Sequence, residues 1–165
     1  MATCSTIAEI QRFLIPKLEI IAQEIEENIK TKNKEKIQEI VYNAGSPSMY
    51  NRTGEFLESW GGETYQTGEG AEAMFEYQPD KLSLGSADPG DASYGQHVSV
   101  VTGADVRNAL AYIIFKSGAY PLWGGGYWSS PRDAWQALLQ IVGGADMRKW
   151  VEAGAKKAGL KIQWV

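Results

Sequence analysis

Residues 7–44 read IAEIQRFLIPKLEIIAQEIEENIKTKNKEKIQEIVYNA, a stretch that contains no glycine and a single proline. Its apolar residues recur at intervals of three and four, which places them on one stripe of an amphipathic helix. The stripe consists of Ile7, Ile10, Phe13, Leu14, Leu18, Ile21, Ile25 and Ile29 and, after the polar stretch 30–36, of Ile37, Ile40, Val41 and Ala44. Ser5 or Thr6 is suited to cap the start and Gly45 to end the helix. The spacing therefore predicts a long N-terminal helix within residues 1–44.

Pro16 lies inside this pattern. An interior proline loses one backbone hydrogen bond and crowds the preceding turn, so we expect either a kink at Pro16 or a helix that begins near Ile15. Two roles are open for this helix. Its apolar stripe covers the core, or part of it projects as a surface for self-association or for a partner.

The rest of the chain has a different composition, because all 18 glycines and all 6 tryptophans follow residue 44. A length of 165 residues favours a single domain over 1–165, made of the helix 1–44 and an α+β body over 45–165. The net charge of −4 argues against a surface that coats nucleic acid. There is no apolar run of membrane-spanning length and no signal-peptide pattern. We expect a protein made in the cytosol, without a membrane partner.

The body alternates turn-forming stretches with short periodic segments. EFLESW, residues 55–60, predicts one or two helical turns, and residues 64–67 and 71–77 predict a hairpin of two strands joined by TGEG. The other expected elements are a continuation of the sheet at Leu82 and Leu84, a helix over 104–116, a helix that opens with Pro131, a helix over 145–158 and a strand over 160–165. The predicted class is α+β: a long N-terminal helix packed on a small antiparallel sheet, with a C-terminal helical segment and a terminal strand.

No arrangement of residues in the sequence points to catalysis. His97 is the only histidine and lies in a polar stretch, and Cys4 is the only cysteine and lies at the chain end. Nucleophilic catalysis needs a base next to its nucleophile, and one cysteine excludes a cysteine-rich zinc site. Glu72 and Glu76 alternate with apolar residues, which places them on the solvent face of a strand. We therefore predict no enzymatic activity, no cofactor and no metal.

Aromatic and arginine residues are the better candidates for a functional site. Tyr120, Trp123, Tyr127 and Trp128 flank a run of three glycines, Gly124–Gly126. Such rings supply contact area at protein interfaces or stack on sugars, and they equally serve to close one end of the core. Arg52 and Arg132 each lie beside a turn and are suited to clamp carboxylates or backbone carbonyls.

The turn at Arg52, Thr53 and Gly54 also has a structural interpretation. Thr53 is suited to cap the short helix that follows. We expect Gly54 to allow a close approach of the backbone. Arg52 is placed to reach the end of the N-terminal helix, where exposed carbonyls favour a cation.

Two stretches resemble the tail-completion or neck proteins of tailed bacteriophages, minor tail components of the head-tail connection. In YNRTGEFLESW, residues 50–60, the residues Tyr50, Arg52, Thr53, Gly54, Leu57 and Ser59 occupy the positions of the family motif that follows a long helix. YIIFKSGAYPLWGGGYWSSPRDAW, residues 112–135, is similar to the tyrosine-bearing segment, the glycine-aromatic loop and the arginine that opens the C-terminal helix. The order of these motifs along the chain is the stronger part of the resemblance.

The resemblance implies a structural virion protein at the head-tail junction that forms or joins an oligomeric ring. Its implied partners are further copies of itself, the phage connector or stopper, and the tail-terminator or tail-tube proteins, with DNA passing through the lumen without specific binding. The interface candidates are Tyr50, Arg52, Tyr120, Trp123, Tyr127, Trp128 and Arg132. Two alternatives are a small module that binds carbohydrate or cell wall through its loop aromatics, and a phage assembly chaperone.

Overall fold

The structure, a computed structural model, describes residues 6–43, 54–82, 103–117 and 132–164. Its helices are α1 (Ile7–Lys36), α2 (Glu55–Glu58), α4 (Gly103–Tyr112), α5 (Ala134–Val142) and α6 (Ala145–Lys157), and its strands are β1 (Trp60–Gln66) and β2 (Ala71–Tyr77). π-helical turns extend α1 over Ile37–Tyr42 and α4 over Ile113–Ser117, and a 3₁₀ turn, Pro79–Lys81, follows β2. The long helix, the antiparallel hairpin and the C-terminal helices confirm the predicted α+β class.

The chain divides into two compact units. Unit 1 consists of Met1–Lys32, Gly62–Glu76 and Leu138–Val165, and unit 2 of Asn33–Gly61 and Tyr77–Ala137. Each unit therefore combines segments that are far apart in the sequence. The single domain expected over residues 1–165 stays a prediction.

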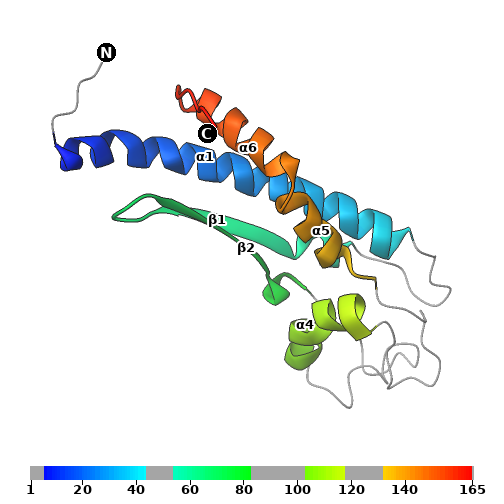
Figure 1. Cartoon of the computed structure of the whole chain (residues 1–165). Helices are drawn as coiled ribbons and strands as arrows, with labels where there is room; N and C mark the ends of the chain where they lie inside the picture. The colour runs from blue at the N-terminus through cyan, green and yellow to red at the C-terminus, as the bar shows by residue number, and fades with distance from the viewer. Residues whose placement is uncertain (1–5, 44–53, 83–102, 118–131, 165) are drawn as a thin grey trace, which may run out of the picture. The chain divides into compact units, whose positions relative to one another are not determined.

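In unit 1, α1 packs between the hairpin and α6 (Figure 1). The Gln66 side chain donates a hydrogen bond of 2.6 Å to the Glu19 carboxylate, and Lys17 donates one of 2.6 Å to the carbonyl oxygen of Ala158. Residues 17 and 19 differ by about 200° around a helix, so the hairpin and α6 contact roughly opposite sides of α1. The seam with α6 is an apolar cluster of Ile21, Ala155 and Ala158 packed with Leu18, Ile25, Val151 and Leu160.

The start of α1 is held by reciprocal hydrogen bonds between Thr6 and Glu9. The backbone N–H of Glu9 donates to Thr6 Oγ1 at 3.3 Å, and the backbone N–H of Thr6 donates to Glu9 Oε2 at 3.2 Å. This capping box satisfies two donors that a helix start leaves unpaired, and it confirms Thr6 as the cap. The helix then continues through Pro16. A start near Ile15 is therefore wrong, because the cap fixes the first turn well before the proline; a kink at Pro16 stays a prediction.

The hairpin has the predicted position. Strand β2 has the expected bounds, and β1 begins four residues earlier than expected, at Trp60. The connection is closed by a backbone bond of 2.9 Å from Thr67 N–H to the Gly70 carbonyl oxygen. The expected continuation at Leu82 is wrong, because Pro79 lacks the N–H that a strand pairing needs and the chain forms a 3₁₀ turn there instead. Leu84 lies outside the described residues.

The C-terminal part differs from the prediction at two places. Helix α5 begins at Ala134, not at Pro131, because the Asp133 carboxylate caps it by accepting a 2.9 Å hydrogen bond from the N–H of Gln136. Residues 160–164 form no strand. Gly159, at φ +68°, ends α6 and turns the tail back, and no strand pairs with it among the residues that are described.

The helical turn α2 follows Gly54, whose φ is +81°. Among the described residues, a Cβ placed on Gly54 would meet no atom within 4 Å. The expected close approach of the backbone therefore does not occur with any described residue, and glycine is favoured here because this left-handed conformation penalises a side chain. Thr53, expected to cap α2, lies outside the described residues.

Candidate interaction surfaces

Arg132 is the one predicted interface residue that the structure describes. Tyr50, Arg52, Tyr120, Trp123, Tyr127 and Trp128 lie outside the described residues. The arginine belongs to unit 2 and immediately precedes Asp133 and α5. Its position beside a turn predicts that its guanidinium binds carboxylates or backbone carbonyls.

The Arg132 guanidinium donates a hydrogen bond of 3.0 Å to the carbonyl oxygen of Val41, within the turn that ends the N-terminal helix. The last carbonyls of a helix carry partial negative charge, so a cation is favoured there. Arg132 therefore contacts a backbone carbonyl, as one form of the expected clamp requires, whereas its role in an interface stays a prediction. The sequence predicted that Arg52 contacts this end of the helix, and that contact stays a prediction because Arg52 lies outside the described residues.

The residues that flank the aromatic stretch 118–131 contact one another. We call Ile114, Lys116, Arg132 and Asp133 the base of this stretch. The backbone N–H of Arg132 donates to the carbonyl oxygen of Ile114 at 3.0 Å, and Lys116 forms an ion pair with Asp133. One backbone bond and one ion pair thus join the residues on either side of the stretch. The base is anchored to the end of the N-terminal helix through Val41.

A cluster of aromatic rings fills the core of unit 2. Trp60 stacks on Phe115 at 5.7 Å and on Trp135 at 5.3 Å between ring centroids. Phe56 meets Trp60 edge-on at 6.1 Å and Phe115 at 5.8 Å. Trp60 and Phe115 are only 5% and 4% exposed. At these positions aromatic residues close the core, which was one of the two roles we considered for the aromatics of this chain.

This cluster joins the two stretches that carry the resemblance. Phe56 and Trp60 come from residues 50–60, and Phe115 and Trp135 come from residues 112–135. Stretches that are separated by more than fifty positions in the sequence therefore pack against each other within one unit.

Tyr77 connects the end of the hairpin to α4. Its hydroxyl donates a hydrogen bond of 2.6 Å to the carbonyl oxygen of Arg107, and the Arg107 guanidinium donates one of 3.3 Å to the carbonyl oxygen of Leu82. Burial raises the pKa of Tyr77 far above its ordinary value. The phenol thus stays protonated and acts as a structural donor.

Asn33 is a core residue that its polar neighbours in the sequence did not predict. The stretch 30–36 reads as a polar interruption, yet Asn33 is fully buried. Its side-chain amide has no hydrogen-bond partner among the residues that the structure describes. Burial of such a group without a partner costs free energy. The spacing of the residues could have predicted the burial of Asn33, because Ile29, Asn33 and Ile37 follow one another at intervals of four on the apolar stripe.

The first turns of α1 form an exposed apolar surface. Ile7, Ile10 and Phe13 are exposed, Ile7 to 76%. The contact of Lys17 with Ala158 marks the level at which α6 ends, and α1 continues from there for ten further residues, Ile7–Pro16. From Leu18 onward the stripe covers the core of unit 1. The core-covering role is thus confirmed for this part of α1, whereas a role in self-association stays a prediction for its first turns.

Neither a metal site among the described residues nor a similar known protein indicates a function for this chain. Within the four described ranges, no group of three or more His, Cys, Asp or Glu side chains could hold a metal ion, and no helix in them is both long and apolar enough for a membrane span. His97 and Cys4 lie outside those ranges. No known family model, no curated protein and no solved structure matches this chain.

Proposed function

We propose that this protein is a non-enzymatic structural component of a tailed-phage virion that acts at the head-tail junction as a tail-completion or neck protein. One observation carries the proposal. The two stretches that resemble this family, residues 50–60 and 112–135, pack together through Phe56, Trp60, Phe115 and Trp135. Two local resemblances that form one core support a common origin better than two isolated motifs would.

The order of the elements also supports the proposal. A long helix, a helical turn after Arg-Thr-Gly, a hairpin and the C-terminal helices follow one another along the chain, which is the order that the resemblance implies. The closed base formed by Ile114, Lys116, Arg132 and Asp133 suits the presentation of the aromatic stretch 118–131 to a partner, since binding residues are commonly carried by loops on a rigid scaffold.

In this role the protein forms or joins a ring at the junction. Copies of the chain meet one another, and the ring contacts the connector or stopper on one side and the tail-terminator or tail-tube proteins on the other. DNA passes through the lumen without specific binding. The net charge of −4 is compatible with this passage, because a basic lumen would retain phosphates. The protein is made in the bacterial cytoplasm and ends in the virion.

The test uses the phage that carries this gene. Mass spectrometry of purified virions should detect the protein, and phage that lacks the gene should accumulate filled heads and separate tails in electron micrographs. Absence from finished virions would favour an assembly chaperone. Normal joining of heads and tails without the gene would refute the proposal.

Complementation with variants then tests the aromatic stretch. Trp123→Ala combined with Trp128→Ala should abolish joining, whereas Leu139→Ala, which truncates an exposed apolar side chain of α5 in unit 1, should complement fully. The carbohydrate-binding alternative predicts a different result: retention of the purified protein on cell-wall glycan that is lost in the Trp123, Trp128 double variant.

A further inference from the structure

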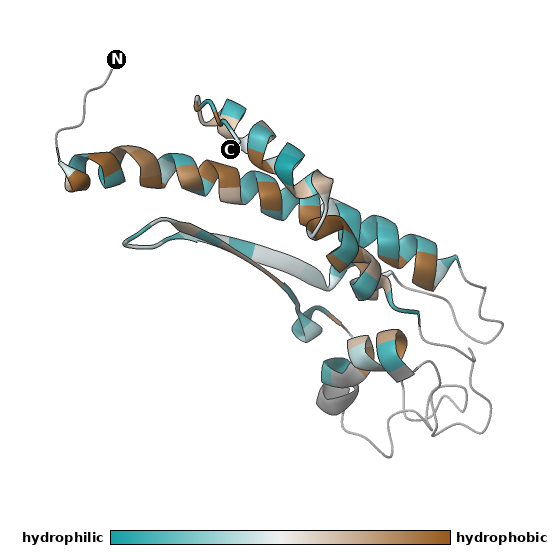
Figure 2. Ribbon diagram, viewed as in Figure 1, coloured by the Kyte–Doolittle hydropathy of each residue, from teal (hydrophilic) through white to brown (hydrophobic). Residues whose placement is uncertain are grey.

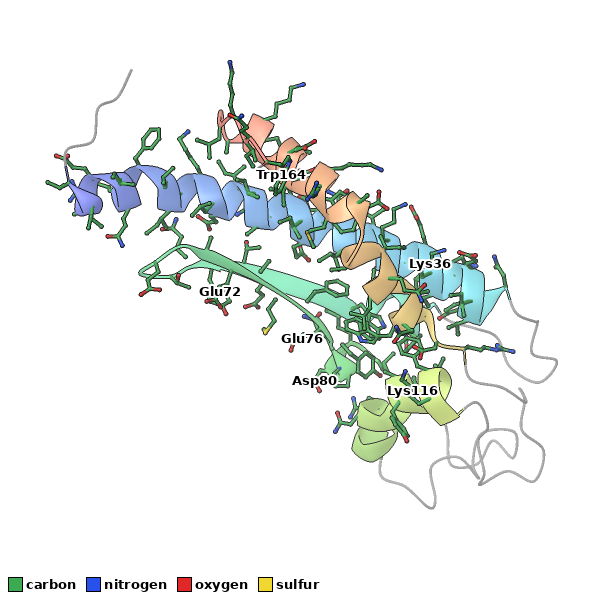
Figure 3. All side chains as sticks on the ribbon, in the orientation of Figure 1. Lys36, Glu72, Glu76, Asp80, Lys116 and Trp164 are labelled. Atoms are coloured by element: carbon green, nitrogen blue, oxygen red, sulfur yellow. The ribbon has the colours of Figure 1, made fainter. Side chains whose placement is uncertain are left out.

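The hairpin presents an open face on the side away from α1. Side chains alternate between the two faces of a strand, and Gln66 lies on the covered face because it reaches Glu19. The open face carries Glu63, Tyr65, Glu72, Met74 and Glu76, all of which are exposed. Figure 3 shows Glu72 and Glu76 on this side of the hairpin. We call these five residues the open hairpin face.

This face is acidic with an apolar centre. Residues 60–77 include four glutamates and neither lysine nor arginine. Tyr65 and Met74 are 45% and 44% exposed, and the Tyr65 hydroxyl donates a hydrogen bond of 2.8 Å to Glu72. Apolar side chains bordered by charged ones are the usual arrangement of a protein interface. Like charges on one face repel each other, so a basic partner would stabilise this face.

The same unit carries a surface of opposite charge. The stretch 145–164, which holds α6 and the tail, contains five basic residues, Arg148, Lys149, Lys156, Lys157 and Lys161, and two acidic ones, Asp146 and Glu152. Lys149 pairs with Asp146, and Lys157 pairs with Glu24. Lys156 and Lys161 are exposed, and neither pairs with a carboxylate among the described residues. We call the exposed end formed by Lys156 and Lys161 the basic end.

The two surfaces cannot meet within one copy of unit 1. The hairpin and α6 contact roughly opposite sides of α1, and the open hairpin face points away from that helix. Figure 2 shows the same arrangement, with α1 between the two elements. Any contact between the acidic face and the basic end therefore joins two molecules.

We propose that the open hairpin face of one copy docks on the basic end of a second copy. The choice of a second copy rests on the proposed ring function. The contact pairs two different surfaces, so each copy has one free acidic face and one free basic end, and further copies add head to tail. Such a heterologous contact closes into a ring when its rotation allows. The apolar centre of Tyr65 and Met74 supplies burial, and Glu63 and Glu76 supply the charge that meets Lys156 and Lys161.

Charge reversal on each side tests this contact. Sedimentation velocity on the full chain measures the association constant at about 0.05 M and about 0.5 M NaCl, where screening differs strongly. Glu63→Lys with Glu76→Lys, or Lys156→Glu with Lys161→Glu, should each lower association roughly tenfold or more at low salt. Wild-type association should fall at high salt. The neutral pair Glu63→Gln with Glu76→Gln should weaken association by a smaller factor.

Restoration distinguishes a specific contact from an effect of net charge. An equimolar mixture of the two reversed variants should associate again, because each then offers the charge that the other needs. A single chain with all four reversals, whose net charge equals that of the wild type, should self-associate as the wild type does. Circular dichroism checks that these exposed substitutions leave the fold intact.

Several outcomes would overturn the docking proposal. These are a monomer at all concentrations and salts, association that does not respond to salt, or reversed variants that stay apart when mixed. If the charge-reversal series behaves as expected but the protein is absent from virions, the docking stands and the head-tail function fails. If heads and tails need the protein but the series fails, the function stands and the docking is wrong.

Discussion

Replacement of Gly154 by alanine tests the packing of unit 1 most directly. Gly154 is buried in α6 where this helix meets α1. A Cβ at this position would lie 2.8 Å from the Cα of Ile21 and 3.2 Å from the Cβ of Glu24. Carbon atoms in contact prefer about 3.5 to 4.0 Å. The nearest atom belongs to the backbone, so no side-chain rotation relieves the contact, and the two helices must separate by about 0.7 Å there.

Two terms set the size of the effect. Overpacking of a well-packed seam costs about 1–3 kcal/mol, and the backbone contact places this substitution in the upper part of that range. Alanine in a helix interior is favoured over glycine by about 1 kcal/mol. We expect Gly154→Ala to lower the free energy of unfolding by about 1–2 kcal/mol. For a chain of this size the melting temperature would fall by about 2–8 °C.

Urea unfolding followed by circular dichroism and tryptophan fluorescence measures this change. The matched control is Gly68→Ala in the turn of the hairpin, where an added Cβ would meet no atom of the described part of the chain within 4 Å. That variant should be about as stable as the wild type or slightly more stable. A Gly154→Ala variant that matches or exceeds the stability of the wild type would refute the close helix contact.

Three further predictions concern single groups. Arg132→Met removes the donor to the Val41 carbonyl and should lower the free energy of unfolding by about 1.5 kcal/mol; an unchanged urea midpoint would contradict this. The hydrogen bond from Lys157 holds the pKa of Glu24 below its ordinary value. The stabilisation by this carboxylate is therefore present above about pH 4.3 and is lost as the pH falls through the lowered pKa. The stability difference between wild type and Glu24→Gln should shrink on acidification, and a constant difference would speak against the ion pair. Burial raises the pKa of Tyr77, so its contribution to stability is present below about pH 10 and is lost at higher pH. In an absorbance titration of the native protein, Tyr77→Phe should remove one late-titrating phenol, and identical curves would show that Tyr77 is not buried.

Elements with a strong local pattern were predicted from the sequence. The intervals of three and four in residues 7–44, and the alternation in 71–77, each belong to one regular structure. The turn residues TGEG then place the hairpin connection. These signals depend on neighbours along the chain, and α1, β2 and the region of α4 followed them.

The wrong predictions concern choices that depend on competing local caps or on distant partners. Pro131 and Asp133 are both suited to the start of a helix, and the carboxylate of Asp133 prevails through its hydrogen bond to Gln136. The tail alternates Leu160, Ile162 and Trp164 like a strand, yet a strand needs another strand to pair with. The Trp164 indole N–H instead donates a 2.7 Å hydrogen bond to Glu152 of α6.

The sequence predicted that Arg132 belongs to the candidate interaction surface, but it did not predict which residue Arg132 contacts. A position for Arg132 beside a turn suggested a clamp on a carbonyl, but only the fold brings Val41 within reach across ninety-one positions. Asn33 shows the converse case. Its helical spacing placed it on the buried stripe, whereas its polarity argued for solvent, and burial prevailed because both Ile29 and Ile37 lie on the same stripe.

The rings of Phe56, Trp60, Phe115 and Trp135 stack on one another in the core of unit 2. Trp123 and Trp128 lie outside the described residues, so closure of the core and contact with a partner both stay predictions for them. The two roles differ in what the double tryptophan variant does to stability, because loss of a buried ring costs about 3–5 kcal/mol whereas loss of an exposed ring costs little. Failure of joining with an unchanged free energy of unfolding would therefore indicate contact with a partner, and failure together with a large loss of stability would indicate closure of the core.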